Sequence, residues 1–324
     1  MNIIEVKNLT KKFNGLTVVD DVSFAVNKGE IFGFLGPNGA GKSTTINMLS
    51  TILPVTDGEA FINDFSILSQ RDDVRKSIGL VFQDPSLDDR LTAEENLRFH
   101  AKLYGVPNDK FQKRKQEVLE LVDLWDRRSD IVKNFSGGMK RRLEIARGLL
   151  HYPAVLFLDE PTIGLDPQTR AHLWDYILRL KREKEITIFM TTHYMNEAEY
   201  CDRIAIIDHG KIVASGTPRE LKKQVGGDVI SMASKQKMEL KKELEERYKK
   251  EVKEKGGFLQ VEVEDGEKFL PRLFNELTAK IDSIELRNPT LDDVFLSLTG
   301  RAIREEKASD KEHIRQHMKM RRRT

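Results

Sequence analysis

Short, uninterrupted apolar runs recur along much of the chain, and longer stretches with helical spacing separate them. A continuous apolar run of this length is typical of a strand buried on both faces, as in a parallel sheet. Four such runs are Ile31 to Leu35, Ile78 to Phe82, Val155 to Leu158 and Ile186 to Met190. The pattern therefore predicts an α/β core. A hairpin is expected near its end, around Asp208-His209-Gly210.

The first part of the chain has shorter apolar runs that are separated by turn residues. Apolar residues dominate Ile3 to Leu9 and Val22 to Val26, with turns predicted at Asn14-Gly15 and Asp57-Gly58. Ala60 to Ile62 resembles a further strand. This pattern predicts short strands joined by turns before and after the first core helix.

A helical stretch, Leu91 to Trp125, interrupts the alternation of strands and helices. Thr92 and Glu95 match a capping box, and Gly105 to Asn108 divides the stretch into two helices. We therefore expect a helical subdomain, at about residues 88–148, inserted into the α/β core.

The composition changes after Gly226-Gly227, where we predict a linker. Residues 1–226 are then expected to form one domain. Strand-like and helix-like stretches predict a small α+β accessory domain at residues 227–300. Residues 301–324 form a charged tail that we expect to be disordered.

Bulk properties narrow the function classes. The chain has 324 residues and a net charge of +2, so no strongly charged partner is required and no nucleic acid is expected. One cysteine, Cys201, excludes an internal disulfide. The N-terminus lacks the pattern of a signal peptide, and no apolar run approaches the length of a membrane span. We expect a soluble chain whose membrane role, if any, requires another subunit.

One stretch carries a specific chemical pattern, G-x-x-x-x-G-K-[ST], between a predicted strand and a predicted helix. Glycines allow main-chain N–H groups to curl around phosphate oxygens, and the helix N-terminus favours an anion. The lysine can reach β- and γ-phosphates, and the hydroxyl can bind Mg²⁺. The alternative, a glycine-rich turn with a chance lysine, is disfavoured by the flanking elements. The pattern and the residue after it consist of Gly36, Pro37, Asn38, Gly39, Ala40, Gly41, Lys42, Ser43 and Thr44.

A second potential anion site lies at Ser136-Gly137-Gly138, which opens the predicted helix from Met139 to Leu150. Taken alone, these residues are equally consistent with an ordinary helix cap. One buried strand ends in Asp159-Glu160. Adjacent carboxylates there are costly unless they meet a cation or water. In phosphate-loop enzymes the aspartate supports Mg²⁺, and the next carboxylate can orient the attacking water.

Four further residues carry weaker signals. Gln83 and His193 follow predicted strands, where ligands bind in open α/β sheets. His193 is able to act as a γ-phosphate sensor, although a lone histidine is more often structural. Asp166 is a predicted helix cap, with Pro167 at the first helical position. Phe13 is able to stack on a purine, but without context a core role is favoured.

Together the stretches GPNGAGKS, FSGGMKRR, VLFLDEP and GLD, with Gln83 and His193, resemble the nucleotide-binding subunit of an ABC transporter over about Met1 to Gly226. The resemblance implies a phosphate-loop NTPase (RecA-like) core with an antiparallel β subdomain and an inserted helical subdomain. By the resemblance, Glu160 is the catalytic base, and Lys42 and His193 assist catalysis. Ser43, Gln83 and Asp159 surround Mg²⁺. The other residues implied at ATP are Phe13, Ser136, Gly137, Gly138 and Asp166, with Met139 completing the signature.

Two departures from the family pattern stand out. The signature reads FSGGM, where leucine and glutamine are common at its ends, and Phe13 replaces a tyrosine. The serine and glycines that meet phosphate are retained, and stacking does not need the tyrosine hydroxyl. We therefore expect an active site.

A narrower resemblance concerns Gln83 to Thr92 and Asn288 to Phe295, which are similar to motifs of daunorubicin-resistance ATPases. That resemblance implies an ATP-hydrolysing subunit at the inner face of the membrane. It would pair head to tail with a second copy and drive a separate exporter permease for a drug, lipid or polysaccharide.

Other roles remain as alternatives. ABC ATPases that act outside transport usually carry tandem nucleotide domains or a long coiled-coil insertion, and neither feature is present. An importer ATPase is disfavoured by the C-terminal motif. A regulatory module without turnover is disfavoured by Glu160 and His193.

Overall fold

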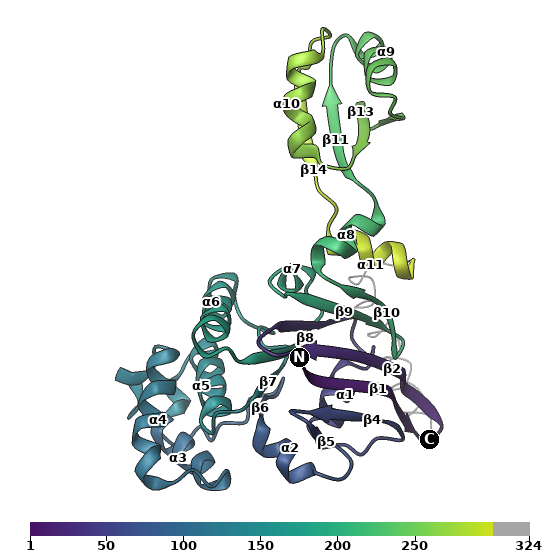
Figure 1. The fold of residues 1–324 in the computed structure, drawn as a ribbon. Helices are drawn as coiled ribbons and strands as arrows, with labels where there is room; N and C mark the ends of the chain where they lie inside the picture. The colour runs from purple at the N-terminus through teal and green to yellow at the C-terminus, as the bar shows by residue number, and fades with distance from the viewer. Residues whose placement is uncertain (301–324) are drawn as a thin grey trace, which may run out of the picture. The chain divides into compact units, whose positions relative to one another are not determined.

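The computed structural model describes residues 1–300, which form two compact units (Figure 1). The first is Met1–Thr217, and the second begins at Pro218. Helix α8 (Pro218–Val225) packs against α11 (Leu291–Thr299), so α8 groups with the second unit rather than with the residues before it. The expected disordered tail, residues 301–324, lies outside the described residues.

A six-stranded sheet forms the centre of the first unit. Five of its strands run parallel, and β10 pairs antiparallel with β9 at one edge. Every residue of β3, β7 and β8 is buried, which explains the apolar runs within them. The carboxyl ends of the parallel strands meet at one edge of the sheet. In spatial order the strands are β10 (Lys211–Gly216), β9 (Arg203–Asp208), β3 (Ile31–Leu35), β8 (Thr187–Thr192), β7 (Val155–Asp159) and β6 (Ile78–Val81).

A second, antiparallel sheet contains two long strands joined at Asn14-Gly15, where the sequence predicted several shorter strands. The prediction of a turn at Asp57-Gly58 is wrong, because these two residues begin a strand. Gly58 has φ +87°, and a Cβ atom there would lie 2.3 Å from the carbonyl oxygen of Asn8. Only glycine therefore fits this position without a shift of the main chain. The strands, in spatial order, are β2 (Leu16–Asn27), β1 (Asn2–Phe13), β4 (Asp57–Ile62) and β5 (Phe65–Ser66).

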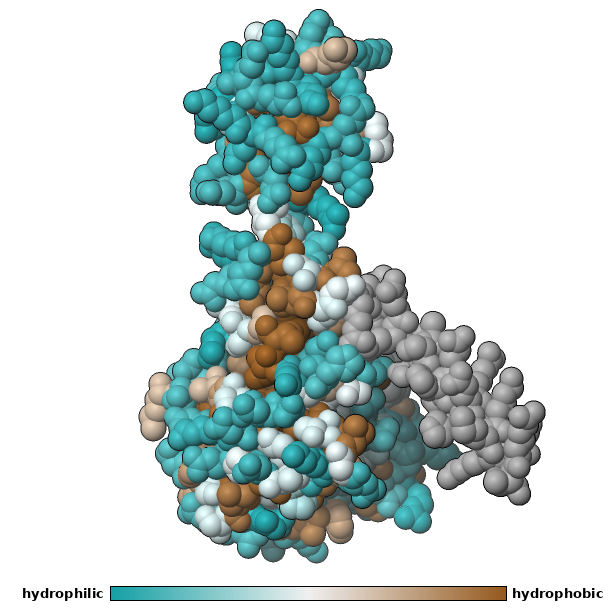
Figure 2. All heavy atoms as spheres, turned by 90° about the vertical axis from the view of Figure 1, so that its right-hand side faces the viewer, coloured by the Kyte–Doolittle hydropathy of each residue, from teal (hydrophilic) through white to brown (hydrophobic). Residues whose placement is uncertain are grey.

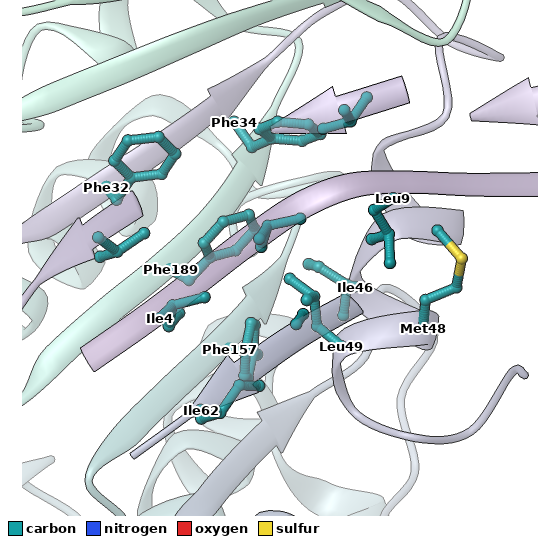
Figure 3. Close-up of a cluster of buried hydrophobic side chains, with 14 of the residues drawn as sticks. Ile4, Leu9, Phe32, Phe34, Ile46, Met48, Leu49, Ile62, Phe157 and Phe189 are labelled. Carbon is teal, nitrogen blue, oxygen red and sulfur yellow. The ribbon is translucent and has the colours of Figure 1, made fainter. Parts of the chain in front are cut away.

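Side chains of the two sheets of the first unit share one buried cluster, in which Phe32 and Phe189 of the central sheet lie near Ile4 of the antiparallel sheet (Figure 3). Phe24 of β2 stacks on Phe32 of β3 with ring centres 5.5 Å apart, and Phe32 stacks on Phe189 of β8 at 5.6 Å. Ile46 and Leu49 of α1 (Lys42–Leu49) belong to the same buried cluster. Truncating one such ring to alanine costs about 3–5 kcal/mol. This packing fixes the strands whose ends carry the candidate site.

The remaining helices of the first unit include the predicted helical subdomain. The capping box is confirmed: Thr92 Oγ1 accepts from the N–H of Glu95, and Glu95 accepts from the N–H of Thr92. Helices α3 and α4 pack against α5, and α5 packs against β6. The elements are α2 (Arg71–Ser77), α3 (Ala93–Leu103), α4 (Asn108–Leu121), the 3₁₀ turns η1 (Trp125–Arg127) and η2 (Val132–Asn134), α5 (Gly137–Leu149), α6 (Pro167–Lys184) and α7 (Met195–Ala198).

The second unit is an α+β fold with its own buried core around Ile230, Leu244 and Val261. Its sheet is antiparallel, and Thr290 caps α11 in a capping box with Asp293. Besides α8 and α11, its elements are β11 (Asp228–Ala233), α9 (Lys237–Tyr248), β12 (Val252–Lys255), β13 (Phe258–Val263), α10 (Gly266–Glu276) and β14 (Ser283–Arg287).

The described surface is mostly hydrophilic on the face that Figure 2 shows, with smaller hydrophobic spots and a more extended hydrophobic area at the level of α8 and α11. Leu296 and Leu298 of α11 are exposed. Within residues 1–300, no helix combines the length and the apolar character that a bilayer crossing requires.

Candidate functional site

The loop from Gly36 to Ser43 connects the buried strand β3 to the N-terminus of α1. Gly39 and Gly41 have φ of +82° and +105°, a region that residues with a side chain rarely adopt. A Cβ atom on Gly36 would lie 2.3 Å from the carbonyl oxygen of Ile207. The glycines are therefore required by the curled main chain, whose N–H groups can face an anion at the helix start.

Lys42 is buried within this loop. Its Nζ donates hydrogen bonds to the carbonyl oxygens of Gly36 and Pro37, at 2.8 and 3.0 Å. The same atom lies 3.2 Å from Oε1 of Glu160. These contacts hold the ammonium group between the phosphate loop and the carboxyl end of β7. A polyanion bound by the loop would meet this charge directly.

Ser43 and Asp159 bring two oxygen donors together at the same edge of the sheet. Ser43 Oγ donates to Asp159 Oδ1 at 3.2 Å, and Thr191 Oγ1 of β8 donates to the same carboxylate oxygen. Hydroxyl and carboxylate oxygens are the donors that Mg²⁺ prefers, together with phosphate oxygens and water. The donor set therefore fits a magnesium–nucleotide complex.

Glu160 has φ +45°, an uncommon main-chain conformation for a residue with a side chain. Such a conformation costs about 1–3 kcal/mol and persists only where surrounding contacts impose it. The N–H of Glu160 donates to the carbonyl oxygen and to Oγ1 of Thr191. Burial alone would raise the pKa of the Glu160 carboxyl, but His193 and Lys42 outweigh it and lower that pKa.

His193 faces Glu160 from the end of β8. Its Nδ1 lies 3.2 Å from Glu160 Oε2, but the two atoms are not aligned as a hydrogen bond. Both are buried, and neither has a hydrogen-bond partner among the described residues. The His193 ring also packs on Tyr194, with ring centres 4.0 Å apart. Two polar atoms thus retain bonding capacity beside Lys42, as a site for phosphate and water requires.

The buried carboxylate of Glu197, on α7, was not identified from the sequence. It accepts hydrogen bonds from Thr162 Oγ1 and from Thr192 Oγ1, the latter at 2.7 Å, and lies near Arg170. Burial raises its pKa, although both hydroxyls counteract the shift. Because Thr162 and Thr192 neighbour the Glu160 and His193 segments, Glu197 links these segments. Its only sequence signal is its position four residues after His193.

Ser136 caps α5, as predicted, and accepts a hydrogen bond from the N–H of Met139 at 3.2 Å. Gly138 lies against α6: a Cβ atom there would be 2.3 Å from Cγ2 of Thr169. Asp166 caps α6 through the N–H of Thr169 at 3.0 Å. In the part of the chain that the structure describes, no hydrogen bond joins Ser136 or Asp166 to the phosphate loop. The two helix starts that are predicted to bind anions are therefore not joined by a hydrogen bond in the described residues.

Two other predicted residues also lie outside the buried cluster. Gln83 is exposed just beyond β6, and within residues 1–300 it forms no hydrogen bond with Ser43 or Asp159. Phe13 is 42% exposed at the end of β1, with Lys11 Nζ 4.9 Å from its ring centre. The core alternative for Phe13 is wrong, because β1 ends at the surface there. Its ring is accessible for stacking.

Two family models match the chain. One, described as ABC transporter, matches residues 19–163, and the other, described as ATP-binding protein DrrA1-3-like, C-terminal domain, matches residues 216–299. The linearmycin resistance ATP-binding protein LnrL of Bacillus subtilis is 39% identical over 312 residues, which cover 94% of this chain and 100% of that protein. The daunorubicin/doxorubicin resistance ATP-binding protein DrrA of Streptomyces peucetius is 38% identical over 306 residues, which cover 92% of each.

A solved structure shows the same fold. The dimeric ATP-binding cassette MJ0796, in a post-hydrolysis state bound to ADP and Pi, is 28% identical, with a TM-score of 0.60. The match covers 66% of this chain and 98% of that one. These similarities agree with the phosphate loop, the buried carboxylate pair and the parallel sheet described above.

The first unit is thus an ATP-binding cassette. The chain belongs to the ATP-binding subunits of ABC transporters, and among them to the daunorubicin/doxorubicin-resistance type. It is an ATPase that binds and hydrolyses ATP to power an exporter. The roles outside transport and in import are not favoured.

Proposed function

We propose that two copies of this chain pair head to tail and sandwich ATP, and that the pair drives a separate membrane permease at the inner face of the membrane. The observation that carries the proposal is that, within residues 1–300, no hydrogen bond joins the two helix starts that are predicted to bind anions. The loop ending at Lys42 and Ser43 would bind one ATP, and Ser136 to Gly138 would contact the ATP held by the partner. The dimeric form of the related cassette MJ0796 supports this arrangement.

Lys42 and the N–H groups of the loop would hold the β- and γ-phosphates. Ser43 and Asp159 would hold Mg²⁺, with Gln83 approaching from the exposed end of β6. Bound there, Mg²⁺ neutralises charge on the phosphates. Phe13 offers an exposed ring for the adenine base. Asp166 would lie at the interface between the two chains.

Glu160 would orient water for in-line attack on the γ-phosphate. Its lowered pKa keeps the carboxylate ionised near neutral pH, so it can accept a hydrogen bond from that water. His193 would bond to a γ-phosphate oxygen and would be oriented by its neighbours in β8 and α7. Hydrolysis would then remove the phosphate contacts that join the two chains.

The transported compound is proposed to be a drug, with a lipid or a polysaccharide as the other possibilities. Relatives named for resistance to linearmycin, daunorubicin and doxorubicin favour a drug. We propose that the first unit, predicted from the sequence as residues 1–226, is the nucleotide-binding domain. The second unit, predicted as residues 227–300, would be an accessory domain that aids assembly. The exposed segment around Gln83 would face the permease.

Glu160→Gln tests the proposal. The variant should bind ATP with an affinity close to that of the wild type, since the loop is unchanged. Its turnover should fall by about 100-fold or more, because the amide is a poor base. It should also accumulate as an ATP-bound dimer in size-exclusion chromatography. Wild-type turnover in Glu160→Gln would remove Glu160 from the proposed mechanism.

A further inference from the structure

Helix α5 carries a buried arginine that reaches three main-chain carbonyl groups outside the helix. The guanidinium of Arg141 donates to the carbonyl oxygens of Asp159 and Pro161, at 2.9 and 2.7 Å, and to that of Phe82. Asp159 and Pro161 flank Glu160, whereas Phe82 immediately precedes Gln83. One side chain therefore contacts the main chain of both segments.

Two further charged residues on the same face of α5 hold the segment after Gln83. Glu144 accepts a hydrogen bond from the N–H of Ser86 at 2.7 Å and pairs with Arg141 at 3.1 Å. Arg147 donates to the carbonyl oxygen of Ser86 at 2.7 Å and also to its hydroxyl. The three side chains are spaced by three residues, so they project from one face of the helix. We call Arg141, Glu144 and Arg147 the α5 clamp.

The clamp has a direct consequence for Glu160. A positive φ at a glutamate must be imposed by neighbouring contacts. The N–H of Glu160 is held by Thr191, and the carbonyl groups on either side are held by Arg141. Arg141 therefore supports the main-chain turn that directs the Glu160 carboxylate toward Lys42 and His193.

We propose that the α5 clamp consists of positioning residues that join the helix capped by Ser136 to the Glu160 turn and to the Gln83 segment. This inference rests on the proposed function, in which Ser136, Glu160 and Gln83 all act at ATP. Through the clamp, a displacement of the Gln83 segment or of α5 changes the position of the Glu160 carboxylate. The hydrogen bonds of the clamp described above go to the Gln83 and Glu160 segments and not to the phosphate loop, so it acts on turnover rather than on nucleotide affinity.

The test uses the purified full-length chain and measures ATPase kcat and KM, the Kd of a fluorescent ATP analogue, and Tm. Arg141→Gln should lower kcat by about 10- to 100-fold, because a small misplacement of a reacting group has effects of this size. KM and Kd should stay within about twofold of the wild type, since the loop is intact. Arg141→Lys should recover part of kcat, because an ammonium group still reaches some of the carbonyl oxygens.

Arg179→Gln is the matched control. Arg179, on α6, also donates to a main-chain carbonyl, that of Leu121, and pairs with Asp123. Among residues 1–300 it forms no hydrogen bond or ion pair with the Glu160 turn. It should lower Tm with little change in kcat. If Arg141→Gln does not fold, the same measurements are made on Arg141→Lys and Ser86→Ala. Each of these variants should have a lower kcat than the wild type and an unchanged Kd.

Wild-type kcat in folded Arg141→Gln, or in both replacement variants, would overturn the clamp. An equal loss of kcat in Arg179→Gln would overturn it as well, since the effect would then follow stability. Absence of ATP turnover in the wild-type chain would instead contradict the proposed function, so the two failures are distinguishable.

Discussion

Ser43 Oγ lies 3.2 Å from Asp159 Oδ1, although the two residues are 116 positions apart in the sequence. Ser43 stands at the start of α1, and Asp159 at the end of β7. Thr191 of the intervening strand β8 donates to the same carboxylate. The contact joins the phosphate loop to the carboxylate pair and creates a pair of oxygen donors suited to Mg²⁺.

Ser43→Ala should raise the Mg²⁺ concentration needed for half-maximal ATPase activity, because one oxygen donor is lost. Asp159→Asn should reduce maximal turnover by about 100-fold or more, since the neutral amide weakens the hold on the metal. Titrating MgCl₂ in an ATPase assay measures both effects. Ser50→Ala, at the other end of the same helix, is the control and should match the wild type. Unchanged Mg²⁺ dependence in Ser43→Ala would exclude Ser43 as a ligand.

Ser136→Arg should block ATP-driven dimerisation but leave the ATP affinity of the isolated chain nearly unchanged. Mixing it with Lys42→Ala chains places both lesions on one of the two shared sites, so the other site stays intact. Partial recovery of ATPase activity is the expected result. Thr92→Ala controls for the lost helix cap, worth about 1 kcal/mol, and should still dimerise. A large loss of ATP affinity in isolated Ser136→Arg would contradict the head-to-tail geometry.

His100 on α3 predicts a pH dependence of stability. Burial, together with the charges of Arg147 and His151, lowers the pKa of His100 to about 3. In the unfolded chain, this histidine takes up a proton below about pH 6.5. The unfolded state then binds more protons, so the stability present above pH 6.5 is lost as the pH falls toward 3.

Between pH 7.5 and pH 5, the free energy of unfolding should fall by about 2 kcal/mol more in the wild type than in His100→Gln. The figure follows from about 1.36 kcal/mol for each pH unit below the pKa of about 6.5 in the unfolded chain. Urea unfolding at both pH values measures the difference. His172→Gln removes an exposed histidine and should behave as the wild type does. An identical pH response in His100→Gln would show that other groups cause the loss.

The exposed apolar residues of α11 predict a role of the second unit in assembly. Leu291, Val294 and Phe295 are buried, whereas Leu296 and Leu298 are exposed. The double variant Leu296→Glu/Leu298→Glu should leave ATP affinity unchanged and reduce co-purification with the co-expressed permease. Met238→Glu, on the exposed side of α9, is the control. Equal permease recovery in all three proteins would exclude this surface from assembly.

The sequence alone was sufficient to predict the features that depend on local chemistry. Gly36, Gly39 and Gly41 predict a curled phosphate loop, because positive φ angles and close main-chain contacts exclude side chains at these positions. Helix caps at Ser136 and Asp166 depend on residues only three positions away. Continuous apolar runs likewise identified β3 and β7, which are fully buried.

Other features depend on residues that are distant in sequence, and only the tertiary structure revealed them. Asp57-Gly58 resembles a turn locally, but pairing with β1 makes it the start of a strand. The exposure of Phe13 depends on where β1 ends relative to the sheet surface. Glu197, Glu144 and Arg147 lie outside the motifs, and Arg141 lies within FSGGMKRR without any sign of its partners. Their roles depend on contacts with other elements.

The sequence by itself thus determined the phosphate loop, the buried strands of the core and the family. The tertiary structure decided which charges are buried together: Lys42, Glu160 and His193 at one edge of the sheet, and Arg141 with the carbonyl groups that flank Glu160. The physical reason is that helix caps and tight turns follow from neighbouring residues. The pairing of buried charges depends on which strands and helices the hydrophobic core brings together.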